Sequence, residues 1–357
     1  MKVKLLHVVG ARPNLPKLAP VHRAGRAVAG LVQVVVHTGQ HYDQGLSGSF
    51  FRDLGIPAPD INLDVGSASH AQQTARIMER IEPVLERERP DWVVLYGDVN
   101  STVAAALVAV KLGLRTAHVE AGLRSHDRTM PEEINRLVTD RLADLLLTPS
   151  RDADEALRGE GEPAEEIVFV GNVMIDSLFH ALPAARRTRS RSALGVNGDA
   201  VIVTLHRPSN VDVPARLAGL VQALEAVAEE RPVVFPMHPR TAARVAASGL
   251  RFSRVRTLAP VGYLEMLDLV AGAYGVITDS GGLQEETTAL GVPCLTVREN
   301  TERPVTIAEG TNQLAPDPAT LPGLVKNLTR PDSPPRPEGW DGRAGERIVR
   351  ALLARSG

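Results

Sequence analysis

Cysteine is nearly absent from this sequence, since Cys294 is the only one among 357 residues. One cysteine forms neither a disulfide nor a cysteine-based metal site within a chain, and this favours a reducing compartment. Cys294 lies in an apolar run that predicts a buried strand. We therefore expect a core thiol rather than a nucleophile.

Long apolar runs and targeting signals are also missing. No stretch of about eighteen consecutive apolar residues occurs, so we predict that no helix spans a membrane. The N-terminal segment Met1–Leu6 leads into a predicted strand and lacks the apolar length and small-residue cleavage site of a signal peptide. We therefore expect a cytoplasmic protein.

The chain also lacks an excess of either charge, because its formal net charge is only −2. Such a chain has no global basic field, and we expect neither nucleic acid nor a membrane as a partner. An anionic ligand must then be held by local arginine and histidine side chains and by helix ends. The one basic run, formed by Arg186, Arg187, Arg189 and Arg191, predicts a solvated linker face.

Short β-branched runs alternate with longer helical patterns, and the chain length suits two domains. Continuous apolar strands of this kind are typical of a parallel sheet that is covered on both faces. The alternation pauses between residues 179 and 199, so we predict two doubly wound, Rossmann-like α/β domains at residues 1–174 and 175–357. The Pro-rich segment Thr329–Gly339 is a predicted loop, and the last predicted helix, Ala344–Ala354, could pack on either domain. The predicted strands are Leu5–Val9, Val32–Thr38, Trp92–Tyr96, Thr116–Val119, Leu145–Thr148, Ile167–Val170, Val201–Leu205, Val233–Pro236, Val255–Leu258, Gly275–Thr278 and Cys294–Val297.

Polar or charged residues follow nearly every predicted strand. In doubly wound sheets, ligands bind beyond the carboxyl ends of the strands. Asp and Asn are also ordinary turn and cap residues, so a single position carries little weight, whereas the whole set favours one large cleft that both domains face. The segments concerned are Gly10–Asn14, Thr38–His41, Gly97-Asp98, Glu120–Arg124, His206-Arg207, His238-Pro239 and Asp279–Gly282.

The segment Ser280-Gly281-Gly282 opens the predicted helix Leu283–Leu290. Free backbone N–H groups and the helix dipole attract an anion at such a place, and glycines allow close approach. Glu286 follows one turn later and could accept hydrogen bonds from two ribose hydroxyls while the helix start holds a diphosphate. The alternative is a glutamate that only complements the helix dipole, and the sequence leaves both open.

The first predicted turn, Gly10–Asn14, lacks the G-x-G-x-x-G spacing of dinucleotide-binding turns, so we expect no bound NAD and no other cofactor. Arg12 and Lys17 could instead supply fixed positive charge to phosphate oxygens. No spacing of His, Asp and Glu predicts a metal site, and no nucleophile elbow is present. His7, inside the first strand, predicts a satisfied core histidine, whereas His206 at a strand end is open between a functional and a structural role.

Four acidic residues form a further group of candidates. Asp98 and Glu120 each follow a predicted strand, and Glu132 and Glu133 lie at the start of the predicted helix Pro131–Ala143, which has Pro in its first turn. Acidic residues in a first helical turn often only complement the helix dipole, and for Glu133 we favour that interpretation.

These motifs resemble the non-hydrolysing UDP-N-acetylglucosamine 2-epimerases. The resemblance runs from Gly10 to about Arg303, and its three longest strings, spaced in this order, are highly specific. It implies a fold like that of the glycosyltransferase-B enzymes, a UDP-sugar substrate, isomerase activity without a cofactor, and a homodimer. The matching strings are Gly10–Pro13 with Lys17, Thr38–His41, Gly97-Asp98, His118–Arg124, Pro131–Arg136, His206-Arg207, Thr278–Glu286 and Thr301–Pro304.

The chemistry implied by the resemblance interconverts UDP-N-acetylglucosamine and UDP-N-acetylmannosamine. The proton at carbon 2 of the sugar has no neighbouring carbonyl to acidify it, so the family is held to eliminate UDP to a bound glycal and to add it back. This route needs a base on one face, an acid on the other, and cations at the departing diphosphate. The implied catalytic residues are Asp98, Glu120, Glu132 and His206, and the assignment of each carboxylate to a sugar face stays open. The implied substrate-binding residues are Arg12, Lys17, Arg136, Arg207, His238, Ser280, Gly281, Gly282 and Glu286.

The sequence departs from the family pattern at several positions. Many members have Glu where Asn14 stands, and His-Arg-Arg-Glu-Asn where this chain has His206–Asn210. These departures leave open a related UDP-2-acetamido sugar as the substrate. The segment Gln40–Asp43 differs from a loop linked to allosteric activation by a second UDP-sugar, so that regulation is open too. The alternatives to an epimerase are a glycosyltransferase of the same fold, a hydrolysing relative and a non-enzymatic module that binds a UDP-sugar.

Overall fold

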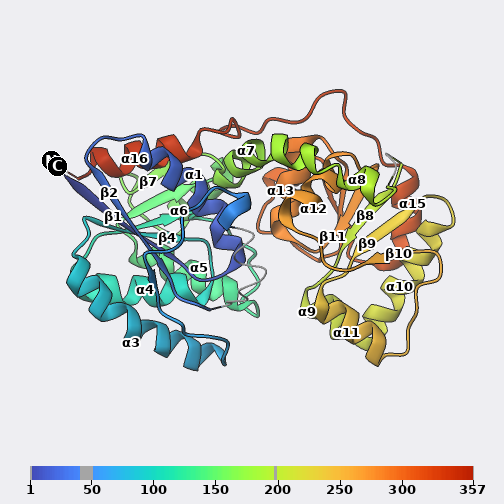
Figure 1. Ribbon diagram of the computed structural model, residues 1–357, viewed down its shortest axis with the longest axis horizontal. Helices are drawn as coiled ribbons and strands as arrows, with labels where there is room; N and C mark the ends of the chain where they lie inside the picture. Colours follow the sequence, from blue (N-terminus) through green and yellow to red (C-terminus); the bar gives the residue numbers. More distant parts are fainter. Residues whose placement is uncertain (1, 41–50, 197–198, 357) are drawn as a thin grey trace. The chain divides into compact units, whose positions relative to one another are not determined.

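The computed structural model describes residues 2–40, 51–196 and 199–356 and divides the chain into two compact units (Figure 1). The first unit consists of the chain up to His180 together with the segment from Glu338 onward, and the second unit is Ala181–Pro337. The division falls inside α7 (Val173–Thr188). The loop segment Gln40–Asp43, apart from Gln40 itself, lies outside the described residues.

The first unit is built on a seven-stranded parallel sheet with the order β3-β2-β1-β4-β5-β6-β7. The chain first adds β2 and β3 on one side of β1, and then adds β4, β5, β6 and β7 on the other side. Its strands are β1 (Val3–Val9), β2 (Leu31–His37), β3 (Ile61–Asn62), β4 (Trp92–Tyr96), β5 (Thr116–Val119), β6 (Leu145–Thr148) and β7 (Ile167–Phe169). Its helices are η1 (Arg12–Asn14), α1 (Leu15–Arg26), α3 (His70–Glu88), α4 (Asn100–Lys111), α5 (Pro131–Leu142), α6 (Arg151–Gly159), the first part of α7, and α16 (Ala344–Ala354).

Helices cover both faces of this sheet, as Figure 1 shows for α1 and α16 on one side and α3 and α4 on the other. Leu6 and Val8 of β1 belong to one buried cluster with Ile77 and Ile81 of α3. Alternate residues of a strand point to opposite faces, so Leu5 faces the other helical layer. Burial on both faces explains why the strands are continuous apolar runs.

The last helix of the chain belongs to the first unit, where α16 packs against α1. Asp176 of α7 accepts hydrogen bonds from the backbone N–H groups of Ala344 and Gly345 at 3.1 and 2.8 Å. Gly345 lies so close to α1 that an added Cβ would be 2.7 Å from the carbonyl group of Pro20. The absence of a side chain at Gly345 therefore permits the close packing of these two helices.

The second unit repeats the design with a six-stranded parallel sheet in the order β10-β9-β8-β11-β12-β13. Its strands are β8 (Val201–Thr204), β9 (Val233–Pro236), β10 (Arg256–Leu258), β11 (Gly275–Thr278), β12 (Cys294–Thr296) and β13 (Asn312–Leu314). Its helices are α8 (Ser190–Ala193), α9 (Pro208–Val211), α10 (Pro214–Ala228), α11 (Pro239–Ala247), α12 (Tyr263–Ala271), α13 (Gly281–Leu290), α14 (Val305–Ala308), η2 (Pro318–Thr320) and α15 (Leu321–Lys326). Val203 packs in a cluster with α10 and α15, whereas its neighbour Ile202 packs with α12 and α13.

The predicted fold class, two doubly wound α/β domains, is confirmed. The segment Thr329–Gly339 contains neither helix nor strand, as predicted. Cys294 is fully buried, and this burial raises the pKa of its thiol to about 11.

The linker prediction for the basic run was wrong in part: Arg186 and Arg187 are exposed, but they belong to α7. Apolar residues at helical spacing on the buried side of α7 outweigh the polar composition of this stretch. Among the described residues, no helix has the length and apolar character needed to cross a membrane.

Two helical glycines give opposite expectations for substitution by alanine. We expect Gly345→Ala to lower the free energy of unfolding by about 1–3 kcal/mol, because backbone atoms of Pro20 occupy the space of the new Cβ. Gly219, in the middle of α10, has open space around an added Cβ, so Gly219→Ala should raise stability by about 0.5–1 kcal/mol. Urea unfolding of both variants tests this pair. A stabilised Gly345→Ala variant would contradict the close packing of α1 and α16.

Candidate functional site

The strand order of the first unit reverses between β1 and β4, and candidate residues follow both strands. Ligands bind at such a switch point because the segments after the two strands diverge to opposite faces of the sheet. Arg12 follows β1 and Asp98 follows β4. The carboxyl ends of parallel strands lie at the same edge, and Glu120, directly after β5, joins this group.

Asn14 joins the first of these segments to the second. Its Oδ1 accepts hydrogen bonds from the N–H groups of Gly10 and Ala11, both at 3.0 Å, and its Nδ2 donates to the carbonyl oxygen of Tyr96 at 2.8 Å. The side chain is fully buried, and only an amide can accept and donate in this way. The sequence marked Asn14 as a departure from the family pattern but gave no sign of its partners. Arg12, in the same turn, has an exposed side chain.

Glu120 and Lys17 form a buried ion pair. Lys17 lies in the first turn of α1, and Glu120 adopts a left-handed backbone conformation with φ of 72°. Gly97 lies beside the pair, because a Cβ there would collide with Lys17 Nζ and come within 3.5 Å of Glu120 Oε2. The structure thus brings together two of the predicted site residues and requires a glycine next to them.

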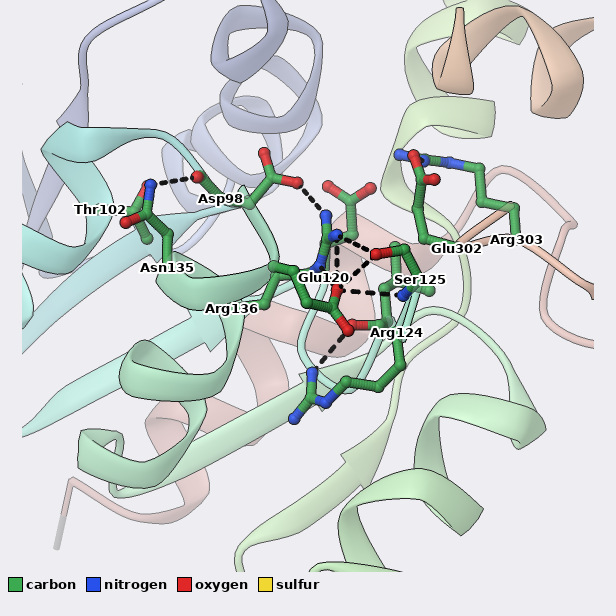
Figure 2. A network of polar contacts seen from close by, with 12 residues as sticks. Asp98, Thr102, Glu120, Arg124, Ser125, Asn135, Arg136, Glu302 and Arg303 are labelled. Atoms are coloured by element: carbon green, nitrogen blue, oxygen red, sulfur yellow. Dashed lines mark hydrogen bonds and ion pairs between the residues drawn. The ribbon is translucent and has the colours of Figure 1, made fainter. Parts of the chain in front are cut away.

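Arg136 joins Asp98 to Glu133 (Figure 2). Its guanidinium group contacts Asp98 Oδ2 and lies 2.7 Å from Glu133 Oε2. The amide of Asn135 donates to the backbone oxygen of Asp98 at 2.8 Å, so consecutive residues of α5 hold both the side chain and the backbone of Asp98. Glu132, which precedes them on α5, has an exposed side chain.

Glu133 has a larger structural role than the helix-dipole partner that we expected. It is buried and accepts hydrogen bonds from the N–H and hydroxyl of Ser125 at 3.0 Å and from the N–H of His126 at 2.9 Å. Burial alone would raise its pKa, but the Ser125 N–H and Arg136 hold the pKa below its usual range. Glu133 therefore anchors the loop after β5 to α5, and no local pattern in the sequence indicates these partners.

The second unit has the same kind of switch point, between β8 and β11. Asp279, directly after β11, is fully buried and accepts hydrogen bonds from the N–H groups of His206 and Arg207 and from the amide of Asn210, at 2.9–3.1 Å. Burial would raise the pKa of Asp279, yet His206 and these donors lower it. Asp279 thus fixes the segment after β8, a role that the sequence analysis did not assign.

His206 and His238 lie close together in this unit. Their ring centroids are 6.0 Å apart, and His206 Nδ1 is 2.9 Å from Asp279 Oδ1. The His206 side chain is 43% exposed, so one edge of an oriented imidazole remains accessible. His238 caps the start of α11, where its Nδ1 accepts the N–H of Arg240 at 3.2 Å. His238 therefore has a structural role as a helix cap, and its ring also lies beside that of His206.

The start of α13 is the strongest candidate for an anion site. Ser280 is the N-cap residue, and Ser280, Gly281 and Gly282 are all partly exposed. A Cβ at Gly281 would collide with the guanidinium group of Arg303, which therefore lies beside the first turn. Backbone N–H groups, the helix dipole and an arginine at one place favour a bound diphosphate.

Acidic partners hold Arg303 in place. Its Nε lies 3.0 Å from Glu285 Oε1, and its Nη1 contacts Glu302. Arg298 is 2.7 Å from the other oxygen of Glu302. Burial would raise the pKa of Glu302, but Arg303 and Arg298 hold it well below its usual range. Arg303 lies in the Thr301–Pro304 string of the family resemblance, but no role was predicted for it.

Glu286 lies one turn into α13 and is 7% exposed. The hydroxyl of Tyr263 donates to its Oε1 at 3.1 Å. Burial raises the pKa of Glu286 to about 7, and the neighbouring Glu285 acts in the same direction. Glu120 and Asp98 each contact a cation, whereas Glu286 contacts the hydroxyl of Tyr263.

Across residues 2–40, 51–196 and 199–356, no three His, Cys, Asp or Glu side chains are grouped closely enough to hold a metal ion.

Comparisons with known proteins agree with this geometry. A family model described as UDP-N-acetylglucosamine 2-epimerase matches residues 23–353. The chain is 39% identical over 363 residues to the UDP-N-acetylglucosamine 2-epimerase of Methanocaldococcus jannaschii, covering 98% of this chain and 99% of that protein. It is 44% identical over 315 residues to the UDP-2,3-diacetamido-2,3-dideoxy-D-glucuronate 2-epimerase of Pseudomonas aeruginosa, covering 87% and 88% of the two chains. A crystal structure of the Methanocaldococcus jannaschii enzyme in complex with UDP-GlcNAc and UDP matches 99% of this chain and 100% of its own with a TM-score of 0.90.

Two doubly wound sheets with polar groups at each switch point are typical of α/β proteins that bind ligands beyond the carboxyl ends of their strands. Within that class, the chain belongs to the UDP-N-acetylglucosamine 2-epimerase family and is an epimerase, a kind of isomerase. The family predicted from the motifs is therefore confirmed.

The raised pKa of Glu286 predicts a pH-dependent stability. Below about pH 4.5 the carboxyl group is protonated in the folded and the unfolded chain alike, whereas between about pH 4.5 and 7 the unfolded chain ionises first. The folded state therefore loses up to about 3 kcal/mol as the pH rises through this window. We expect Glu286→Gln to be more stable than wild type at pH 8 but not at pH 4.

Thermal unfolding of the two proteins at both pH values tests this prediction. Glu309→Gln is the matched control, because Glu309 is an exposed glutamate of the same unit. An equal pH dependence for wild type and Glu286→Gln would show that Glu286 ionises normally in the folded chain.

Proposed function

We propose that this enzyme interconverts UDP-N-acetylglucosamine and UDP-N-acetylmannosamine by eliminating UDP to a bound glycal and adding it back. Membership of the family supports the reaction, and the relative from Methanocaldococcus jannaschii, whose solved complex contains UDP-GlcNAc and UDP, supports the substrate class. The observation that carries the proposal is the start of α13. The guanidinium group of Arg303 lies beside Gly281 in the first turn of this helix, and Glu286 follows one turn later.

This part of α13 suits a nucleoside diphosphate. The N–H groups after Ser280 and the guanidinium group of Arg303 would bind the diphosphate oxygens. Glu286 would accept hydrogen bonds from the ribose hydroxyls, which are neutral donors and do not require a cation beside the carboxylate. His206, oriented by Asp279, would donate to a phosphate oxygen as negative charge develops there.

The carboxylates of the first unit supply the proton transfers. One of Asp98, Glu120 and Glu132 removes the proton from carbon 2 while the bond between carbon 1 and the UDP oxygen breaks, and UDP leaves with the bonding electrons. A carbon 1–carbon 2 double bond forms. Protonation of carbon 2 on the other face and attack of UDP at carbon 1 complete the epimerisation. Lys17 and Arg136, which contact Glu120 and Asp98, keep these carboxylates in position.

A second substrate has support of its own. The relative from Pseudomonas aeruginosa is named for a 2,3-diacetamido glucuronate and is 44% identical to this chain. That sugar carries a carboxylate in addition to the diphosphate. Turnover rates measured side by side with UDP-N-acetylglucosamine and UDP-2,3-diacetamido-2,3-dideoxyglucuronate decide between the two, because the true substrate should give the higher kcat/KM.

Incubation of a UDP-sugar with the enzyme alone separates the epimerase from its rivals. An epimerase reaches an equilibrium between two UDP-sugars without an acceptor. A hydrolysing relative accumulates free UDP and free sugar, and a glycosyltransferase gives no product until an acceptor is added.

The elimination route predicts exchange with solvent. In heavy water and without added NAD, the product should carry deuterium at carbon 2, because the catalytic carboxyl group exchanges its proton between turnovers. Asp98→Asn and Glu120→Gln should each lower the rate by about 100-fold or more. Asp332→Asn, in the exposed loop before α16, is the control that should retain full activity. A product without deuterium at carbon 2, measured by proton NMR and mass spectrometry, would falsify the mechanism.

Glu286→Gln should weaken UDP binding, because a neutral amide replaces a charged acceptor of two ribose hydroxyls. The loss expected for charge-assisted hydrogen bonds is about 1.5–3 kcal/mol, measured as UDP affinity by titration calorimetry at pH 8. Glu309→Gln should bind UDP as wild type does. An unchanged affinity for Glu286→Gln would remove Glu286 from the ribose site.

A further inference from the structure

A buried histidine–aspartate pair contacts the backbone of the two loops that carry Asp98 and Glu120. His118, in β5, is fully buried, and its Nδ1 is 2.5 Å from Oδ1 of Asp140 in α5. Its Nε2 is 2.8 Å from the carbonyl oxygen of Gly97. The imidazole therefore contacts a hydrogen-bond acceptor through each of its nitrogen atoms.

Hydrogen-bond geometry fixes the protons of this pair. A carbonyl oxygen only accepts, so Nε2 of His118 must donate to Gly97. Asp140 Oδ2 receives the N–H of Gly122 at 3.1 Å and lies 2.7 Å from the guanidinium group of Arg124, which favours an ionised carboxylate. Nδ1 of His118 faces this carboxylate through Asp140 Oδ1. Burial would raise the pKa of Asp140, but His118 and Arg124 lower it, in agreement with this assignment.

The contacts of the pair reach both candidate acid/base loops. Gly97 directly precedes Asp98, and Gly122 follows Glu120 by two residues. Both glycines have positive φ angles, 62° and 83°, and Glu120 itself is left-handed. A non-glycine residue keeps that conformation only where surrounding contacts hold it. The hydrogen bond between His118 and the carbonyl oxygen of Gly97 fixes the backbone before Asp98. The hydrogen bond from the N–H of Gly122 to Asp140 fixes the backbone after Glu120.

We propose that His118 and Asp140 are positioning residues for epimerisation, which hold the backbone of the loops carrying Asp98 and Glu120 in the geometry needed for proton transfer. This inference rests on the proposed function. It assigns the pair no contact with the substrate, since His118 and Asp140 are both almost fully buried. The predicted consequence is a loss of turnover without a loss of UDP binding.

A second buried histidine of the same sheet provides the contrast. His7 in β1 contacts the hydroxyl of Tyr96 and the side-chain oxygen of Gln33, and burial lowers its pKa to about 3. It is thus a neutral core histidine, as the sequence predicted. Its hydrogen bonds are confined to side chains and do not reach the backbone of either loop. His7 therefore supplies a control for the cost of altering a buried imidazole.

Two conservative substitutions separate positioning from packing. In His118→Gln the amide nitrogen takes the place of Nε2 and can still donate to Gly97, whereas in His118→Asn it takes the place of Nδ1 and can donate only to Asp140. The experiment measures kcat, UDP affinity and the unfolding temperature for both variants and for His7→Gln. The substrate is the UDP-sugar that the wild-type enzyme epimerises.

We expect kcat to fall about 10-fold in His118→Gln and about 100-fold in His118→Asn, because small displacements of catalytic groups cost this much. UDP affinity should stay at the wild-type value in both. His7→Gln should keep kcat even where it lowers the unfolding temperature. If a His118 variant does not fold, Asp140→Asn takes its place, with the same expected loss of kcat and retention of UDP binding.

Activity of His118→Asn equal to or above that of His118→Gln would overturn the inference. So would a loss of kcat in His7→Gln as large as in the His118 variants, because activity would then follow core stability. Failure of the proposed function has a different signature, in which the wild-type enzyme itself epimerises no UDP-sugar.

Discussion

Compensation of buried charge at the carboxyl ends of parallel strands is the constraint on which both units depend. A carboxylate taken out of water needs a cation or several N–H donors, since an unpaired buried charge is far more costly than a surface one. Glu120 has Lys17, and Asp279 has two backbone N–H groups and an amide. Glu286 accepts a hydrogen bond from the Tyr263 hydroxyl, and burial raises its pKa to about 7. Within the second unit, Asp279 therefore has a lowered pKa and Glu286 a raised one.

The two units present different chemical groups on the same kind of topology. In each, the chain returns past its first strand, so the segments after two adjacent strands diverge and leave backbone and side-chain groups accessible. In the first unit these segments end in carboxylates held by Arg136 and Lys17, which suits proton transfer. In the second they end in an oriented imidazole and the start of α13, which suits an anion. Shared topology therefore does not imply a shared role.

The sequence predicted the strands well because strands covered on both faces are short, continuous apolar runs. Trp92–Tyr96, Thr116–Val119 and Gly275–Thr278 have the predicted bounds. The edge strands β3 and β13 were not predicted, since β3 has only two residues and β13 is polar at Asn312 and Gln313. The places of Asp98, Glu120 and Asp279 after strands were predictable from the strand pattern, whereas the partners of Asn14 and Glu133 were not. Their hydrogen bonds join segments that only the folded chain brings together.

The return of α16 to the first unit has a consequence for synthesis. Domains made on the ribosome tend to fold as they emerge, beginning with the N-terminal one. Here the seven strands of the first unit are complete before Ala181 is made, but the helix that covers α1 is translated only after the whole of the second unit. Until then the surface of α1 around Pro20 has no partner from α16, and Asp176 has no helix start to cap. The nascent chain therefore carries an unfinished first unit while the whole of the second unit, Ala181–Pro337, is made.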